Sequence, residues 1–313
     1  FSTHLTETYG MTQNPVIFID GEAGTTGLEI RQRLVDLPVQ LHTIDPAHRK
    51  DPAARKEAML AAELVVLCLP DAASREAAEM MAEEGAGAPR LLDASSAFRT
   101  ASDWVYGLPE LTPGQTQKIA SAQRVSNPGC YPTGAIALLR PLIDAGVLDA
   151  HYPVSINAVS GYSGGGRAMI EAHEQEGGPA FELYGLGLEH KHVPEIHLHA
   201  GLKRRPVFVP SVGHFPRGMI VSVPLHLDDL KGHVTTEDLH SALTAHYAGQ
   251  DKIKVLPAEG SLSASALAGN DGMELRVHGS THSRQAVLTA RLDNLGKGAS
   301  GAALQNIALM LGL

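Results

Sequence analysis

The chain has 313 residues, 43% of them hydrophobic, a length that suits two domains better than one compact core. Its formal net charge is -9, and it lacks the basic stripe that nucleic-acid-binding proteins usually carry. With 32 glycines and only 4% aromatic residues, the composition is typical of α/β enzymes and excludes a fibrous or disordered chain.

The N-terminal part alternates between predicted strands and helices. Val16–Asp20 is a short apolar run before a glycine, which is typical of a buried parallel strand. Apolar residues from Leu28 to Leu37 then recur at helical spacing until Pro38. Further elements are a strand at 41–45, a helix at 53–62, a strand at 64–69, a helix at 74–84 and a strand at 90–93. This alternation predicts a doubly wound parallel sheet of Rossmann type.

The pattern changes after Cys130. A helix is predicted over 133–145, and strand-like runs then dominate, with helices between them near 167–174 and 236–248. The predicted strands are 154–159, 207–209, 219–225, a short run at Val255, and 275–278. This mixture indicates an α+β domain with a mostly antiparallel sheet. We expect the apolar helix at 302–311 to pack back on the first domain.

These patterns divide the chain into two domains. Residues 11–129 are predicted to bind a dinucleotide, and residues 130–295 to serve catalysis, substrate binding and oligomerisation. The segment 296–313 is expected to join the first domain, so that the boundary is discontinuous. Residues 1–10 are polar, precede Met11, and are interpreted as a leader or the remnant of a tag.

The cellular compartment is indicated by the cysteine count. Only Cys68 and Cys130 are present, which argues against a disulfide framework and for a reducing compartment. No apolar run approaches the ~20 residues of a membrane-spanning helix, and no secretory signal is visible. The short basic cluster at 203–205 is interpreted as a solvated turn. We therefore predict a cytoplasmic protein with no nucleic-acid or membrane partner.

A glycine-rich segment follows the first predicted strand and opens the first helix. Glycines let the backbone approach a pyrophosphate, and the helix N-terminus supplies free N–H groups and a favourable dipole. The spacing is GxxGxxG rather than the commoner GxGxxG, so a glycine turn without a ligand is the alternative. The predicted cofactor contacts are Gly21, Gly24, Thr25, Thr26 and Gly27.

The end of the second predicted strand bears on the choice of cofactor. Asp45 lies roughly 20 residues after the glycines, where an acid would hold the ribose hydroxyls of NAD. His48, Arg49 and Lys50 follow directly, and cations there can bind the 2′-phosphate of NADP instead. We predict NADP(H), with Arg49 as a contact; the alternative is that these are ordinary surface residues of a turn.

The segment 126–134 (SNPGCYPTG) holds the predicted nucleophile. Proline and glycine fix a tight turn, so Cys130 lies at or before a helix N-terminus, where the dipole lowers the pKa of a thiol. The thiolate form attacks carbonyl carbons, and Asn127 with nearby backbone N–H groups is placed to receive the developing oxyanion. Cys68 lies within an apolar strand and is interpreted as an inert core residue.

Several motifs in this order resemble the N-acetyl-gamma-glutamyl-phosphate reductase family, most closely its short (type 2) form. They are GEAGTTG (21–27), DASSAFR (93–99), VYGLPE (105–110), SNPGCYPTG (126–134), SGYSGGGR (160–167), HKHVPEI (190–196) and HFPRG (214–218). The similarity runs from about Val16 to the C-terminus. It implies NADPH-dependent reduction of N-acetyl-γ-glutamyl phosphate through a cysteine thioester, in arginine biosynthesis. It also implies kinship in fold and mechanism with aspartate-semialdehyde dehydrogenase and glyceraldehyde-3-phosphate dehydrogenase.

The segment 190–196 is, by this resemblance, the histidine-bearing motif of the active site. A thiolate acyl-transfer site needs a proton shuttle near neutral pH, and histidine is suited to that. We predict His192 as the acid and base, with His190 as the alternative, and Glu195 as the orienter of the histidine or a contact to the amine side of the substrate. His190 and Lys191 are also predicted substrate contacts. A zinc site lacks cysteine support, so no metal is predicted.

Ser95 and Arg99 follow the strand at 90–93, at the sheet edge where open α/β sheets place ligands. An arginine with hydroxyls can grip a phosphate through charge-assisted hydrogen bonds, and the resemblance assigns this segment to the substrate phosphate. The family more often has DLSADFR here; this chain departs from it at three positions and keeps both residues. An arginine packed on a helix end is the alternative.

The glycines of 160–167 indicate close backbone approach to a ligand, and the resemblance places the nicotinamide end of the cofactor nearby. The predicted contacts there are Ser163, Gly164 and Gly165. His214 and Arg217 are predicted contacts of the substrate carboxylate or phosphate, with structural roles as the alternative for both. We expect a homo-oligomer, either a dimer or a tetramer.

Three other functions fit parts of the pattern. A reductase of the aspartate-semialdehyde dehydrogenase type shares the acyl-phosphate chemistry, but the segment 190–196 speaks against it. A non-catalytic dinucleotide-sensing module would bind NADPH without a reactive thiol. A cysteine hydrolase would not need the glycine loop.

Overall fold

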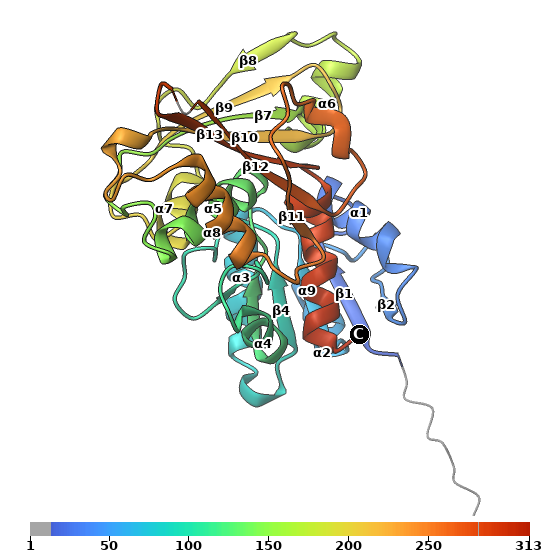
Figure 1. Ribbon diagram of the computed structural model, residues 1–313. Helices are drawn as coiled ribbons and strands as arrows, with labels where there is room; N and C mark the ends of the chain where they lie inside the picture. The colour runs from blue at the N-terminus through green and yellow to red at the C-terminus, as the bar shows by residue number, and fades with distance from the viewer. Residues whose placement is uncertain (1–13, 281) are drawn as a thin grey trace, which may run out of the picture.

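The computed structural model of the protein describes residues 14–280 and 282–313, which form two sheets with their own helices (Figure 1). The proposed leader at 1–10 lies outside the described residues. None of the helices in the described part has both the length and the apolar character needed to cross a membrane.

The first sheet has six parallel strands in the order β2-β1-β3-β4-β6-β5. The strands are β1 (Val16–Asp20), β2 (Gln40–His42), β3 (Leu64–Leu67), β4 (Arg90–Asp93), β5 (Val105–Tyr106) and β6 (Arg124–Ser126). The helices are α1 (Thr25–Leu34), α2 (Pro52–Leu60), α3 (Asp71–Ala82) and α4 (Gln115–Ser121). Within β1, Ile17 and Ile19 join one core and Phe18 joins another. Because both faces are buried, the expected doubly wound parallel sheet is confirmed.

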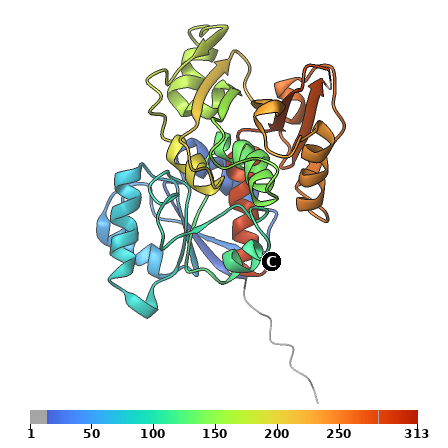
Figure 2. The ribbon, with the colours of Figure 1, turned by 60° about the vertical axis from the view of Figure 1, so that its left-hand side comes forward.

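The last helix, α9 (Gly301–Leu311), packs on this first sheet. Its residues Ala303 and Ile307 belong to the same core as Ile17 of β1 and Ile30 of α1. In both views the helix, drawn in red, runs beside the first sheet (Figures 1 and 2). The chain therefore returns to its first sheet at the end.

The second sheet has seven strands in the order β11-β12-β13-β10-β7-β9-β8. The strands are β7 (Ser155–Gly161), β8 (Phe181–Leu183), β9 (Val207–Gly213), β10 (Met219–His226), β11 (Ile253–Val255), β12 (Met273–Ser280) and β13 (Gln285–Leu292). The helices are α5 (Cys130–Asp144), α6 (Gly166–Glu174), α7 (Val193–His199) and α8 (Thr236–His246). Only the pairs β7–β9 and β11–β12 are parallel, so the predicted, mostly antiparallel sheet is confirmed.

Helix α5 positions the candidate site described below, because its first residue is Cys130 and its apolar residues pack in the core of the second sheet. Its residues Leu138 and Leu142 are fully buried in one cluster with Val221 of β10 and Leu288 of β13. The helix begins at Cys130 rather than at residue 133, because the extended Gly129 already occupies the N-cap. Packing against two central strands fixes the helix axis, and with it the position of the cysteine.

Some elements were not predicted. Strands β5, β6 and β8 have only two or three residues each, which is too few to show an alternating pattern. Strand β13 lies in the middle of the second sheet and was missed, although every second residue from Ala286 on is apolar. Helix α7 was expected as a turn, because it has only seven residues and contains a proline in its first turn.

Candidate active site

A cleft of about 370 Å³ lies where the first sheet meets the second domain. Among its lining residues are Thr25, Thr26, Arg99, Asn127, Cys130, Ser163, Gly164, Gly165, His190, Lys191 and His192. The start of α1 and the start of α5 thus face the same space, although more than a hundred positions separate them in the sequence. Most of the predicted cofactor and catalytic residues are therefore brought together.

The glycine loop makes a close turn between β1 and α1. Gly21 has φ +89°, and a Cβ there would lie 2.3 Å from the carbonyl oxygen of Cys68. A Cβ on Gly27 would lie 2.4 Å from the carbonyl oxygen of Gly21, so this glycine packs the helix on the loop rather than lining the cleft. Gly24 is the N-cap of α1 and has no side chain to satisfy the first N–H groups of the helix. These N–H groups are available to an anion.

A second cavity, of about 810 Å³, extends from the glycine loop along the end of β1 and is lined by Arg49, Lys50 and Arg55. Asp45 instead accepts a hydrogen bond from the backbone N–H of Ala47 at 2.8 Å, within its own turn. Two cations at this position, with Asp45 turned into its own loop, fit the 2′-phosphate of NADP(H). Arg55 is less available, because it pairs with the buried Asp20 at the end of β1, at 2.7 Å.

The cysteine turn is shaped by Gly129. A Cβ on this residue would lie 2.7 Å from Nη1 of Arg99 and 2.7 Å from Nε2 of His192. The missing side chain therefore lets a guanidinium and an imidazole reach the backbone next to Cys130. On the other side, a Cβ on Gly298 would lie 3.0 Å from Cβ of Cys130, so the π-helical segment η5 (Gly296–Ser300) packs directly on the cysteine.

The protonation states of the site differ from the expectation. Burial raises the pKa of the Cys130 thiol to about 11 and outweighs the N–H of Tyr131 and the charge of Arg99, which both act to lower it. The backbone N–H at the start of the helix acts in the predicted direction, but burial outweighs it, so the pKa is raised and not lowered as predicted. Burial, followed by the charge of Arg99, holds the pKa of His192 well below its usual range. Thiol and imidazole are thus both neutral at pH 7.

This assignment predicts how fast Cys130 is alkylated. Because only the thiolate reacts, the rate with iodoacetamide is expected to rise about tenfold per pH unit between about pH 7 and pH 10. Peptide mapping by mass spectrometry follows the adduct, with Cys68 as the internal control, because burial raises its pKa to about 12. A rate on Cys130 that does not change over this pH range would show that the thiol is already ionised.

Glu195 holds the cysteine turn rather than the imidazole of His192. Its Oε1 accepts hydrogen bonds from the N–H of Gly129 at 2.8 Å and from the hydroxyl of Tyr106 at 2.6 Å. Its Oε2 pairs with Nη1 of Arg99 at 3.3 Å. Among the described residues, Nδ1 of His192 has no hydrogen-bond partner. The structure therefore gives Glu195 a place beneath the site, where it orients the arginine and the backbone before the nucleophile.

The two histidines of the motif differ in their contact with the cysteine turn. Both rings pack edge-on against Tyr131, with centroids 5.9 Å away for His192 and 6.2 Å away for His190, but Nε2 of His192 also lies directly over Gly129. The backbone N–H of His192 donates to Nδ1 of His190 at 3.1 Å. This arrangement favours His192 as the proton-transfer group, and Lys191 lies exposed at the rim of the cleft.

Arg99 is buried and fixed by several contacts. Its Nε donates to the carbonyl of Asn127 at 2.9 Å, and its Nη2 donates to the carbonyl of Ala94 at 3.2 Å. The side-chain amide of Asn127 donates to the carbonyl of Ala299 at 3.1 Å, so one of its two donors is already engaged. Ser95 does not line the cleft, because its hydroxyl donates to Asp93 at 2.7 Å.

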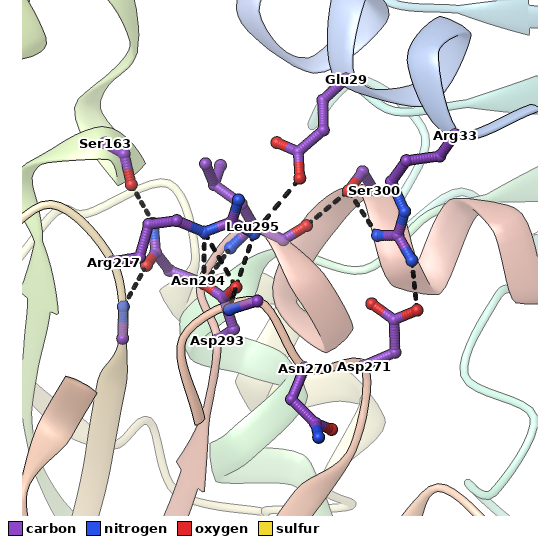
Figure 3. Close-up of polar contacts among 12 residues, drawn as sticks. Glu29, Arg33, Ser163, Arg217, Asn270, Asp271, Asp293, Asn294, Leu295 and Ser300 are labelled. Atoms are coloured by element: carbon purple, nitrogen blue, oxygen red, sulfur yellow. Dashed lines mark hydrogen bonds and ion pairs between the residues drawn. The ribbon is translucent and has the colours of Figure 1, made fainter. Parts of the chain in front are cut away.

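His214 and Arg217 lie outside the cleft that contains Cys130. Arg217 pairs with the buried Asp293 at 2.5 Å and with Glu29 of α1 at 3.2 Å (Figure 3). Nδ1 of His214 lies 2.9 Å from Nδ1 of His173. Arg217 therefore ties the second domain to the helix that follows the glycine loop, and the structure does not bring either residue to the nucleophile.

Sequence reasoning missed the segment 293–300, which lines the cleft from the far side. Asn294 donates to the hydroxyl of Ser163 at 2.9 Å and accepts from the N–H of Gly218 at 2.8 Å (Figure 3). In the same view, Arg33 of α1 reaches Ser300, with Nη1 and Oγ 3.0 Å apart. The glycines at 296 and 298, a few residues after an apolar strand, were the available signal.

The same segment is anchored by a buried ion pair. Nζ of Lys297 lies 2.8 Å and 2.9 Å from the two carboxylate oxygens of Glu110, and both side chains are 1% exposed. Gln305 completes the cluster, accepting from Lys297 at 2.6 Å and donating to Glu110 at 2.9 Å. The pair holds η5, and therefore Gly298, against Cys130.

Known proteins are similar to this chain in sequence and in fold. The family profile described as "Semialdehyde dehydrogenase, dimerisation domain" matches residues 130–294, and "Semialdehyde dehydrogenase, NAD binding domain" matches residues 41–119. N-acetyl-gamma-glutamyl-phosphate reductases of Brucella suis and Brucella ovis are each 53% identical over 309 residues, covering 95% of this chain and 99% of the relative.

The fold is similar to that of aspartate semialdehyde dehydrogenases. The Vibrio cholerae enzyme II, complexed with ASA, has a TM-score of 0.71 at 17% identity and covers 96% of this chain and 99% of its own. The Candida albicans enzyme, with NADP, has a TM-score of 0.66 at 12% identity, with coverages of 95% and 98%. The identity of 53% to the reductases is far higher than the 17% and 12% to these two enzymes of similar fold. The chain therefore belongs to the N-acetyl-gamma-glutamyl-phosphate reductase family of semialdehyde dehydrogenases.

Proposed function

We propose that the protein reduces N-acetyl-γ-glutamyl phosphate to N-acetyl-glutamate semialdehyde and phosphate, with NADPH, in arginine biosynthesis. The observation that supports this most is that Thr25 and Thr26, at the start of α1, line the same cleft as Cys130. A dinucleotide anchored at the glycine loop would extend its nicotinamide towards the cysteine. When bound, NADPH supplies the hydride, and the protein supplies position and proton transfer.

The nucleophile is Cys130, and its proton has to leave before it can attack. We propose that His192 takes this proton as the sulfur bonds to the acyl carbon and phosphate departs, which leaves a thioester. Both groups are neutral beforehand, so the transfer separates charge inside a buried site. The fixed charge of Arg99 beside Gly129 stabilises the anionic sulfur and the leaving phosphate.

The second half of the reaction reduces the thioester. Addition of hydride makes a tetrahedral carbon whose oxygen carries the new charge. We propose that N–H groups at the start of α5 and the amide of Asn127 donate to this oxygen. As the oxyanion collapses to the aldehyde the carbon–sulfur bond breaks, and His192 returns its proton to the departing sulfur, which restores the Cys130 thiol. Throughout both steps, Glu195 holds the guanidinium of Arg99 and the backbone N–H of Gly129 in their positions.

We also propose that the enzyme is a cytoplasmic homo-oligomer, a dimer or tetramer, assembled through the second domain at residues 130–295. The matching profile of a dimerisation domain supports the assembly, and two unpaired cysteines fit the compartment. We retain residues 11–129 with 296–313 as the dinucleotide-binding unit. Light scattering coupled to gel filtration measures the mass of the assembly.

The reaction run backwards tests the proposal. With N-acetyl-glutamate semialdehyde, phosphate and NADP⁺, the protein is expected to produce NADPH, which absorbance at 340 nm follows. Aspartate semialdehyde serves as the parallel substrate and is expected to react at least about a hundredfold more slowly in kcat/KM, because it lacks the acetyl group and one methylene. Equal rates with both aldehydes would contradict the assignment of the substrate.

A further inference from the structure

Three cavities meet at the first turn of α1. The cleft with Cys130, the cavity of about 810 Å³ along β1, and an outer groove of about 650 Å³ all include Thr25 in their lining. If the nicotinamide lies in the first cavity and the adenosine in the second, as the proposed function requires, the pyrophosphate has to cross at this residue. A cation that reaches this crossing can bind it.

Arg167 reaches the crossing from the other domain. It lies in the first turn of α6, directly after the loop that lines the cleft with Ser163, and its side chain borders both the cavity along β1 and the outer groove. Its Nη2 donates to the carbonyl of Ala23, within the glycine loop, at a long 3.5 Å. The guanidinium therefore lies over the phosphate-binding loop without belonging to the first domain.

The charge of Arg167 is uncommitted, unlike that of its neighbours. Arg31 pairs with Glu22 at 3.2 Å, and Arg217 pairs with Asp293 and Glu29. In the described residues no carboxylate lies within ion-pair distance of Arg167. A guanidinium has five N–H donors in a fork that matches phosphate oxygens, and one weak bond to a carbonyl leaves most of them available.

We infer that Arg167 binds the pyrophosphate of the cofactor across the domain boundary. The two cations at the far end of the same cavity, Arg49 and Lys50, lie after the second strand and serve the 2′-phosphate instead. Since Arg167 follows Ser163, Gly164 and Gly165 in the chain, its grip on the pyrophosphate also fixes the loop that lines the cleft beside the nicotinamide. This inference rests on the proposed function for the position of the cofactor.

A comparison of NADPH and NADH binding distinguishes a contact to the pyrophosphate, which both cofactors have, from a contact to the 2′-phosphate, which only NADPH has. Dissociation constants of NADPH and NADH, measured by nucleotide fluorescence, are expected to rise about tenfold each in Arg167→Ala, and less in Arg167→Lys, which keeps the charge. Adenosine 2′-monophosphate, which has no pyrophosphate, is expected to bind equally to wild type and variant. Arg204→Ala, an exposed arginine far from the cavities, is the matched control.

Two outcomes overturn the inference: unchanged constants for both cofactors, or a loss for NADPH and adenosine 2′-monophosphate with NADH unaffected, which would place Arg167 at the 2′-phosphate. Because Arg167 is exposed, its variants are expected to melt at the wild-type temperature. A wild-type protein that binds NADPH but reduces no acyl phosphate would contradict the proposed function, and the binding comparison would still decide the role of Arg167.

Discussion

Cys130→Ser is expected to lower kcat in the reverse assay by on the order of 10⁴-fold or more, with the NADPH dissociation constant within about twofold of wild type. A serine hydroxyl ionises far less readily than a thiol, so neither attack nor thioester formation proceeds. In the proposed binding mode, the glycine loop and the cavity along β1 hold the dinucleotide, and Cys130 does not line that cavity.

The matched control is Cys68→Ser, at the other cysteine of the chain. Cys68 packs beside the core of the first sheet and does not line the cleft, so its substitution is expected to leave kcat within about threefold. Activity and fluorescence titration on both variants give the comparison. A Cys130→Ser protein with more than about a tenth of wild-type activity would exclude the covalent route, and the same loss in both variants would indicate a folding defect.

The position of Cys130 at the start of a helix was predictable because its signal is local. Proline and glycine before Cys130 fix the turn, and the apolar helix after it fixes the direction of the thiol, so neighbouring residues carry most of the information. The pKa was not predictable from the same residues. It depends on the packing of η5 and of the second domain's core around the cysteine, and burial outweighs the helix N-terminus.

The fold shows the same contrast between features set by neighbouring residues and features set by distant ones. Val16–Asp20 and Arg90–Asp93 were predicted to the residue, because strands buried on both faces are continuous apolar runs with clear ends. Arg217 shows the opposite case. The motif around Arg217 indicates a positive charge, but it does not indicate which carboxylates pair with it. The partners Asp293 and Glu29 come from distant parts of the chain.

Lys297→Met is expected to lower the free energy of unfolding by about 3–5 kcal/mol, measured by urea denaturation. Methionine fills a similar volume, but the carboxylate of Glu110 is then buried without its cation and keeps only the amide of Gln305 and its own backbone N–H as donors. Such a carboxylate has a raised pKa in the folded state, so the deficit is smallest near about pH 5 and grows as the pH rises to about 8.

The double variant Lys297→Met with Glu110→Gln removes both charges and keeps an amide partner for Gln305, so it is expected to recover at least half of the lost free energy. Lys231→Met is the matched control: its ion pair with Asp149, at 2.6 Å, involves a lysine that is 89% exposed, and the expected loss is below about 1 kcal/mol. Equal losses in the buried and exposed variants would contradict an anchoring role for Lys297. If the loss is instead confined to the buried pair and activity falls with it, η5 holds Cys130 in place only while its own buried charge is paired.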